Sequence, residues 1–208
     1  DAARGMSVGV RDNSDDTSLL AIQGPRSHDV MAAITGRDLS TMTYYSWTEM
    51  NVLGITAVVS RTGYTGEAGY ELYFDSSAAS ARKIWDGIMA AGKPHAIPPV
   101  GLGARDTLRL EMGYCLYGND IDETTNPLEA GLGWITKPGK GDFIGRDAIL
   151  KVKEGGPARK LTGFILDQPR AVPRQHYPLS VEGKEVGGVT SGTLSPTLDR
   201  GIGMGYLP

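Results

Sequence analysis

The stretch "GITAVVSRTGYTGEAGYELYF", residues 54–74, decides the fold of the first half of the chain. Its opening, "GITAVVS", is apolar and β-branched, which is typical of a strand. The glycine-rich "GYTGEAG" indicates a turn, and "YELYF" indicates the returning strand. We therefore predict two strands joined by a glycine-rich turn.

A carboxylate, Glu71, stands in the middle of the returning strand. Because side chains alternate along a strand, Tyr70, Leu72 and Phe74 share one face, which we predict to be core. Glu71 and Tyr73 share the other face. An ionised carboxylate is almost never fully buried unless it is paired, so Glu71 points either to water or to a ligand that donates hydrogen bonds.

The surrounding sequence predicts a mixture of helices and strands. Apolar residues at helical spacing, bounded by capping residues and glycine, predict helices over 25–36, 75–92, 101–112 and 142–156. Strands are predicted within 15–24 and, as strand–turn–strand, over 44–60. After residue 156 the chain changes to short β-like pieces between Gly, Pro and Asp, which predicts two regions, 1–156 and 157–208.

Composition excludes several classes of protein. The net charge of −3 provides no basic field for nucleic acid or an anionic membrane. The single cysteine excludes an intrachain disulfide framework and a multi-cysteine metal site, and no apolar run reaches the ~18 residues of a spanning helix. The start, "DAARGMSVGV", is no signal peptide, and its lack of Met indicates processing or an excised fragment.

Two polar clusters can be interpreted either as solvent-exposed surface or as part of a binding site. Arg105 and Arg109, four residues apart on one predicted helix face, form either a solvated face or an arginine reaching a pocket, where its planar fork holds a carbonyl or carboxylate. The acidic segment "NDIDE" at 119–123 has oxygen ligands of the kind that calcium uses. Its spacing does not match an EF-hand loop, so a turn with solvated carboxylates is favoured and no metal is predicted.

Four tyrosines flank these features: Tyr64, Tyr73, Tyr114 and Tyr117. They are either ordinary core and rim residues or the walls of an aromatic slot with Glu71 at its end. A carboxylate accepts two parallel hydrogen bonds from adjacent N–H donors, as a 2-amino-4-oxo-pteridine offers. Guanine offers the same pair, so this chemistry indicates only a flat heterocycle.

Long motifs give the chain a family resemblance. The segments "SRTGYTGEAGYELYF", "GLGARDTLRLEMGYCLYGNDIDETTNPLEAGLGW", "DFIGRDAIL" and "GVTSGTLSPTLDRGIGMGYLP" occur in this order. Together they resemble the T-protein of the glycine cleavage system, an aminomethyltransferase that uses tetrahydrofolate. The resemblance implies an α+β fold: a folate-binding core with antiparallel sheets and packed helices, followed by part of a C-terminal antiparallel β-barrel.

The resemblance also implies an activity and a site. The family takes an aminomethyl group from the lipoyl arm of the H-protein, and tetrahydrofolate captures the carbon to give methylenetetrahydrofolate and ammonia. By motif match, Glu71 falls at the pterin-binding glutamate and Arg105 at the folate-contacting arginine. Tyr64 and Tyr114 match tyrosines that line the folate cleft, and Glu67 is the second choice for the carboxylate.

The departures from the family limit these expectations. The aspartate that the family uses to position or activate folate lies upstream of residue 1, so no catalytic residue is assigned here and we expect no turnover from the 208 residues alone. The family's barrel continues past "GMGYLP", so we expect an open strand edge near the C-terminus, with self-association or local disorder after about Thr190.

Relatives of the family supply the alternatives. The same fold occurs as the folate-binding domain of dimethylglycine and sarcosine dehydrogenases, and a non-catalytic folate-binding module is a further possibility. A relative that supports iron–sulfur and tRNA-modification chemistry has a Lys-Gly-Cys motif, whereas "ITKPGKGDFIGRDA" has no Cys. We expect a bacterial cytoplasmic location, with the mitochondrial matrix as the alternative.

Overall fold

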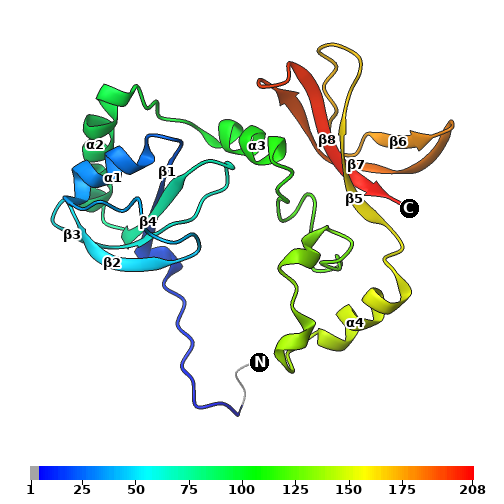
Figure 1. Ribbon diagram of the computed structural model, residues 1–208, viewed down its shortest axis with the longest axis horizontal. Helices are drawn as coiled ribbons and strands as arrows, with labels where there is room; N and C mark the ends of the chain where they lie inside the picture. Colours follow the sequence, from blue (N-terminus) through cyan, green and yellow to red (C-terminus); the bar gives the residue numbers. More distant parts are fainter. Residues whose placement is uncertain (1–4) are drawn as a thin grey trace. The chain divides into compact units, whose positions relative to one another are not determined.

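The chain folds into two compact units. The computed structural model describes residues 5–208, and the units divide between Val100 and Gly101 (Figure 1). Each unit combines helices with an antiparallel sheet, which confirms the predicted α+β class. The boundary near residue 157 stays a prediction. No helix among residues 5–208 is long and apolar enough to cross a membrane.

The first unit contains a four-stranded sheet with the order β1-β4-β3-β2, all neighbours antiparallel. The stretch 54–74 supplies the two central strands of this sheet, as predicted. A two-residue turn joins β2 to β3, with positive φ at Leu53 and Gly54, which matches the twist of a tight hairpin. The strands are β1 (Thr17–Gln23), β2 (Trp47–Val52), β3 (Ile55–Ser60) and β4 (Gly69–Asp75).

Two helices of this unit, α1 (Ser27–Thr35) and α2 (Ala78–Gly92), pack on one face of the sheet (Figure 1). Gly36 ends α1 in the left-handed conformation, which glycine adopts without steric cost. Ser77 caps α2, because its hydroxyl accepts the Ser80 N–H. The helix therefore begins three residues later than the predicted start at residue 75.

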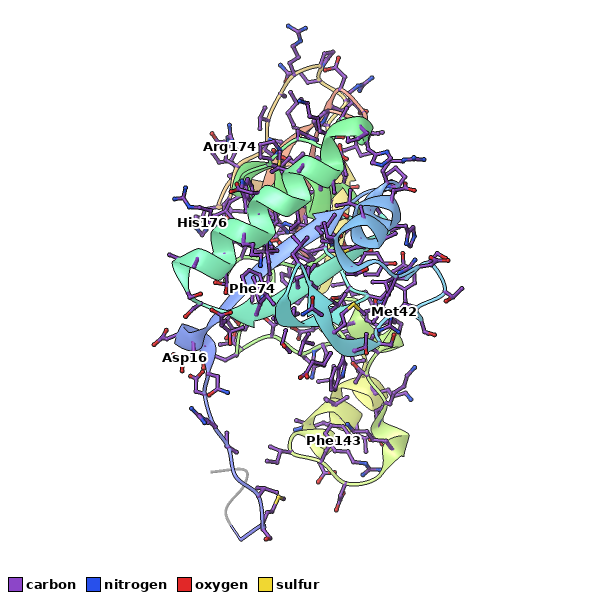
Figure 2. All side chains as sticks on the ribbon, turned by 90° about the vertical axis from the view of Figure 1, so that its left-hand side faces the viewer. Asp16, Met42, Phe74, Phe143, Arg174 and His176 are labelled. Carbon is purple, nitrogen blue, oxygen red and sulfur yellow. The ribbon has the colours of Figure 1, made fainter. Side chains whose placement is uncertain are left out.

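The core of the first unit lies between these helices and the sheet. Tyr70, Leu72 and Phe74 of β4 are buried there, and Phe74 is labelled in Figure 2. The predicted alternation along β4 is thus confirmed. The other buried members include Ile22, Val30, Met31, Ile34, Met50, Val52, Val59, Ile84 and Ile88.

The second unit begins with α3 (Leu102–Glu111) and ends in a sheet with the order β5-β8-β7-β6. Leu110 of α3 packs against Ile202 and Met204 of β8, which places this helix on the sheet. A helix, α4 (Arg146–Gly155), lies between these segments in the chain. The strands are β5 (Lys160–Ile165), β6 (Pro178–Val181), β7 (Lys184–Ser195) and β8 (Arg200–Leu207).

The expectation of an open edge at the last strand is wrong. β8 is a central strand, because β5 pairs with one side and β7 with the other. Its glycines allow close packing: a Cβ at Gly203 would collide with the ring of Phe164, and one at Gly187 of β7 would collide with the Tyr206 carbonyl. The edges of this sheet are β5 and β6.

Candidate functional site

Glu71 lies on the face of the first sheet that is opposite the two helices. The strand register places Ala21 on one side of it and Ser60 on the other, and Trp47 continues the same cross-strand row. Glu71 is half-buried, whereas Trp47 is 68% exposed. Among residues 5–100, no helix covers this face, so the carboxylate is reachable from solvent.

The next row along the sheet is more apolar. Leu19, Tyr73 and Val58 are cross-strand neighbours there. Burial raises the pKa of the Tyr73 hydroxyl, and the negative charge of Glu71 raises it further. The tyrosine therefore stays neutral beside the carboxylate and presents a ring and a hydrogen-bonding group next to it.

The Glu71 carboxylate is oriented by a short hydroxyl relay. Thr62 Oγ1 donates a hydrogen bond to Glu71 Oε2, and Thr62 Oγ1 also lies 3.0 Å from Ser60 Oγ. A hydroxyl has one hydrogen, so Ser60 supplies the hydrogen of the second contact. Because a carboxylate has about four acceptor positions, Glu71 can still accept the two parallel hydrogen bonds of a flat heterocycle.

The glycine-rich turn beside Glu71 is held by Gln23 of β1. The Gln23 amide nitrogen donates to the carbonyls of Thr62 (3.2 Å) and Tyr70 (3.3 Å), and its oxygen accepts from Thr65 Oγ1 (3.2 Å). A Cβ at Gly63 or at Gly69 would collide with the Gln23 side chain. Glycine at these positions therefore lets one amide fill the inside of the turn.

Two predicted site residues lie in this turn. Tyr64 is half-buried, and Glu67 is exposed, with its N–H donated to Thr65 Oγ1 at 3.3 Å. Glu67 is four residues before Glu71 but lies outside β4, so it does not share the cross-strand row of Glu71. The greater exposure of Glu67 favours Glu71 as the ligand carboxylate, and both assignments stay predictions.

Sequence reasoning missed a buried cation behind the turn. Arg61 is only 7% exposed, and its Nη1 donates to the Ser40 carbonyl (3.1 Å) and to the Tyr70 hydroxyl (3.2 Å). Tyr70 in turn donates to the Leu39 carbonyl at 2.7 Å. Burial raises the pKa of Tyr70 although the nearby Arg61 charge opposes it. This cluster anchors the start of the turn from the helix side of the sheet.

The second unit contains the other predicted residues. Arg105 is exposed on α3, and Tyr114 is 38% exposed in the segment 113–121 that follows this helix. Arg109, in contrast, is 1% exposed, and it forms an ion pair with the buried Asp120 at 2.6 Å. The solvated-face interpretation is therefore wrong for Arg109, and the interpretation of Asp120 as a solvated turn residue is wrong as well.

The rest of the acidic segment behaves as a turn. The Asp122 carboxylate accepts the Thr124 hydroxyl at 2.6 Å, the Thr124 N–H at 2.8 Å and the Thr125 hydroxyl at 3.1 Å. These bonds to exposed Asp122 lower the pKa of its carboxyl group, the Thr124 hydroxyl contributing most. In the part of the chain that the structure describes, no group of three His, Cys, Asp or Glu side chains could hold a metal ion.

The five predicted residues thus divide between the units. Glu71, Tyr64 and Glu67 belong to the first, and Arg105 and Tyr114 belong to the second. Their union in one cleft stays a prediction. What the structure does bring together is Glu71 with Thr62, and this partner was not foreseen.

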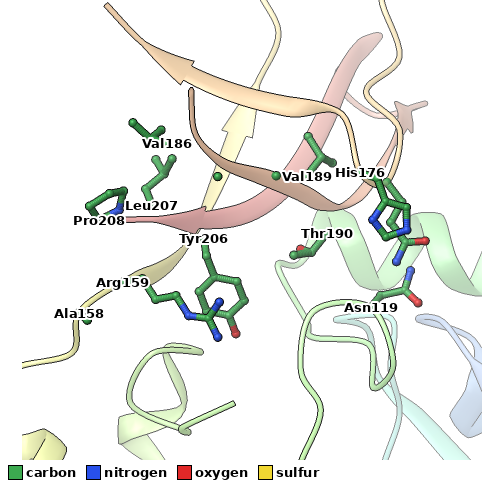
Figure 3. A pocket seen from close by; sticks show the side chains of 13 residues that line it. Asn119, Ala158, Arg159, His176, Val186, Val189, Thr190, Tyr206, Leu207 and Pro208 are labelled. Carbon is green, nitrogen blue, oxygen red and sulfur yellow. The ribbon is translucent and has the colours of Figure 1, made fainter. Parts of the chain in front are cut away.

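The second unit also has a pocket of about 340 Å³ that contains none of the five residues (Figure 3). The guanidinium of Arg159 lies over the Tyr206 ring, 4.3 Å from its centroid, and Arg159 Nε donates to Glu129 at 3.2 Å. His176 and Asn119 lie together at another part of the wall. The pocket and the predicted folate contacts are separate features.

Comparisons with known proteins then decide the family. The GCVT N-terminal domain family matches residues 1–140, and the glycine cleavage T-protein C-terminal barrel domain family matches residues 159–208. The chain belongs to the glycine cleavage T-protein family. This confirms the resemblance, and the second match shows that the C-terminal sheet is part of the family's barrel domain.

Two aminomethyltransferases are similar in sequence to nearly the whole chain. The aminomethyltransferase of Halothermothrix orenii is 52% identical over 198 residues, which cover 95% of this chain and 55% of that protein. The aminomethyltransferase of Flavobacterium psychrophilum is 53% identical, over 98% of this chain and 56% of that protein. The chain therefore spans about half the length of the curated relatives it matches.

A solved structure supports the fold. The crystal structure of glycine cleavage system aminomethyltransferase T from Bartonella henselae matches with a TM-score of 0.80 and 35% identity, over 92% of this chain and 52% of that one. These comparisons favour the aminomethyltransferases over the dehydrogenase alternative.

Proposed function

We propose that this protein acts in tetrahydrofolate-dependent aminomethyl transfer. The donor is the aminomethyl group on the lipoyl arm of the H-protein, and the products are methylenetetrahydrofolate, ammonia and the reduced lipoyl arm. Membership of the T-protein family and aminomethyltransferase relatives at about 50% identity support this proposal. The relatives named above are bacterial, which is compatible with the expected bacterial cytoplasm.

The observation that carries the proposal is the setting of Glu71. Its carboxylate stands on the sheet face opposite α1 and α2, oriented by Thr62 and bordered by the neutral Tyr73. It can accept the N3–H and 2-amino hydrogens of a pterin as two parallel, charge-assisted hydrogen bonds. The chain's part of the chemistry is then to bind and orient the ring so that N5 meets the aminomethyl carbon.

The other predicted residues have supporting roles in this proposal. Arg105 offers a planar fork for a carbonyl or carboxylate of the folate, and the rings of Tyr64 and Tyr114 offer stacking surfaces. No residue of this chain is assigned the catalytic acid. We also propose that residues 1–208 alone do not turn over, which ammonia release from aminomethyl-loaded H-protein would test.

The experiment titrates tetrahydrofolate by calorimetry into the intact protein that contains residues 1–208, comparing the parent with Glu71→Ala. Hydrogen bonds to charged groups contribute roughly 1.5–3 kcal/mol each, so affinity should fall by roughly tenfold to several hundredfold. Glu67→Ala is the matched control and should cost less. If Glu71→Ala binds like the parent, the pterin lies elsewhere; if Glu67→Ala alone weakens binding, the other glutamate is the ligand.

A further inference from the structure

The segment 113–121 that follows α3 carries Tyr114, one of the predicted folate contacts, and the buried guanidinium of Arg109 helps to fix it. Arg109 Nη1 donates to the Tyr114 carbonyl at 3.0 Å and to Asp120 Oδ2 at 2.6 Å. Nε and Nη2 donate to Asp106 Oδ1 at 2.8 and 2.6 Å, and Nη2 also donates to Ser191 Oγ at 2.9 Å. Arg109 thus ties the segment to α3 and to β7.

This arrangement uses every donor that Arg109 has. A guanidinium carries five N–H groups in a fixed plane, and they make five hydrogen bonds to four acceptor atoms: Asp106 Oδ1 twice, Asp120 Oδ2, Ser191 Oγ and the Tyr114 carbonyl. No donor of Arg109 remains for a ligand. Arg109 is buried, whereas Arg105, one helical turn earlier, is exposed.

Asp120 holds the segment from its other end. Its side chain is fully buried, and Oδ2 accepts the Leu116 N–H at 2.9 Å as well as the Arg109 hydrogen bond. Thr190 of β7 donates to Oδ1, and the Tyr206 hydroxyl donates to the Asp120 carbonyl at 2.8 Å. The backbone of the segment is thus fixed at Tyr114, at Leu116 and at Asp120.

Such a buried polar cluster contributes more to the conformation of the segment than to the stability of the fold. Apolar side chains of similar volume often stabilise a fold as well as a buried ion pair does, but they leave the Leu116 N–H and the Tyr114 carbonyl without partners. We propose that Arg109 and Asp120 are positioning residues that fix the segment 113–121, and with it Tyr114, for folate binding. The folate part of this inference rests on the proposed function.

The test compares Arg109→Lys with Arg146→Lys, the same substitution at a partly exposed arginine of α4 in the same unit. Both proteins are studied where circular dichroism shows them folded. An ammonium cannot replace the five-donor plane. We expect Arg109→Lys to speed hydrogen exchange at Leu116 and alkylation of Cys115, the chain's only cysteine, at least tenfold, and to weaken tetrahydrofolate binding at least tenfold.

Arg146→Lys should change none of these three quantities. Asp120→Asn keeps the side-chain volume and serves as the second variant if Arg109→Lys does not fold; it should accelerate the same exchange and alkylation. Parent-like exchange and alkylation in a folded Arg109→Lys or Asp120→Asn protein would overturn the inference. So would a loosened segment with unchanged tetrahydrofolate affinity.

Failure of the proposed function has a different signature. In that case neither Glu71→Ala nor Arg105→Lys affects tetrahydrofolate binding, or the parent does not bind it. The hydrogen-exchange and alkylation results then still decide whether Arg109 fixes the segment, because neither measurement needs a ligand.

Discussion

The two sheets hold their helices by different means. In the first unit, large side chains of β4 such as Leu72 pack into one apolar core with α1 and α2. In the second, the apolar cluster around Leu110, Ile202 and Met204 is small, and glycine-rich strands pack backbone against side chain. Hydrogen-bonded carboxylates and Arg109 supply the remaining links between α3 and the sheet. Volume therefore matters most in the first unit, and hydrogen-bond geometry matters most in the second.

The largest expected loss of stability comes from truncating a large side chain in the core of the first unit. Leu72→Ala removes a fully buried side chain, and Leu→Ala changes at such sites cost about 2–5 kcal/mol. Denaturant unfolding followed by hydrogen exchange should show the loss in β4 and its neighbours. Leu108→Ala, at a 37% exposed position of α3, is the control. Equal losses for the two variants would contradict the assignment of Leu72 to the core.

In the second unit, the corresponding test adds a methyl group where two strands approach closely. Gly187→Ala places a Cβ against the Tyr206 carbonyl, and overpacking of this kind costs about 1–3 kcal/mol. Gly103→Ala in α3 meets nothing within 4 Å and should stabilise by about 0.5–1 kcal/mol, because alanine is a better helix former. Thermal unfolding of the two variants should therefore shift in opposite directions. A shift in the same direction would count against the close approach of β7 and β8.

A pH titration tests the hydrogen-bonded carboxylate that joins α3 to the β7–β8 turn. Burial alone would raise the pKa of Glu111, but hydrogen bonds from Ser195 and Thr197 outweigh it and hold the pKa below the ordinary 4.5. A lowered folded-state pKa contributes stability that is present above 4.5 and is lost as the pH falls through the folded value. The free energy of unfolding of the parent should fall more steeply below pH 4.5 than that of Glu111→Gln. Parallel curves would exclude this contribution.

The smallest expected effect concerns an exposed ion pair of the first unit. Arg26 Nε and Asp29 Oδ2 are 3.0 Å apart at the start of α1, where Arg26 is the N-cap residue, and both side chains are about half exposed. Pairs at this spacing contribute about 0.2–0.5 kcal/mol and are weakened by salt. Asp29→Asn should thus change the unfolding midpoint only slightly, and less so in 1 M salt. A large loss would show that exposed charge, too, organises this chain.

The local features of the first unit were readable from sequence because their causes are local. Alternation along 70–74 placed Glu71 and Tyr70 on opposite faces of the sheet, and the apolar run before the turn predicted β3. The start of α2 was missed by a few residues because Asp75 and Ser77 are both good caps, and the Asp75 carboxylate instead accepts the Ser77 N–H.

The features that were missed depend on partners far away in the chain. Asp120 and Ser191 are 11 and 82 residues from Arg109, so helical spacing could not show that this arginine is buried. The central position of β8 was missed for the same reason, because its partner β5 lies about 40 residues earlier in the chain. Family membership, by contrast, was readable because long motifs need no knowledge of contacts.

The Gln23 side chain inside the glycine-rich turn has a consequence for how this sequence can change over evolution. Gly63 and Gly69 both lack a side chain where the Gln23 amide sits, so alanine at either position would displace that amide from the turn. Shortening Gln23 to Ser would open that space but leave the Thr62 and Tyr70 carbonyls without their donor. Substitutions at these three positions are therefore coupled, and a homologue that has lost one of the glycines should carry a shorter residue in place of Gln23.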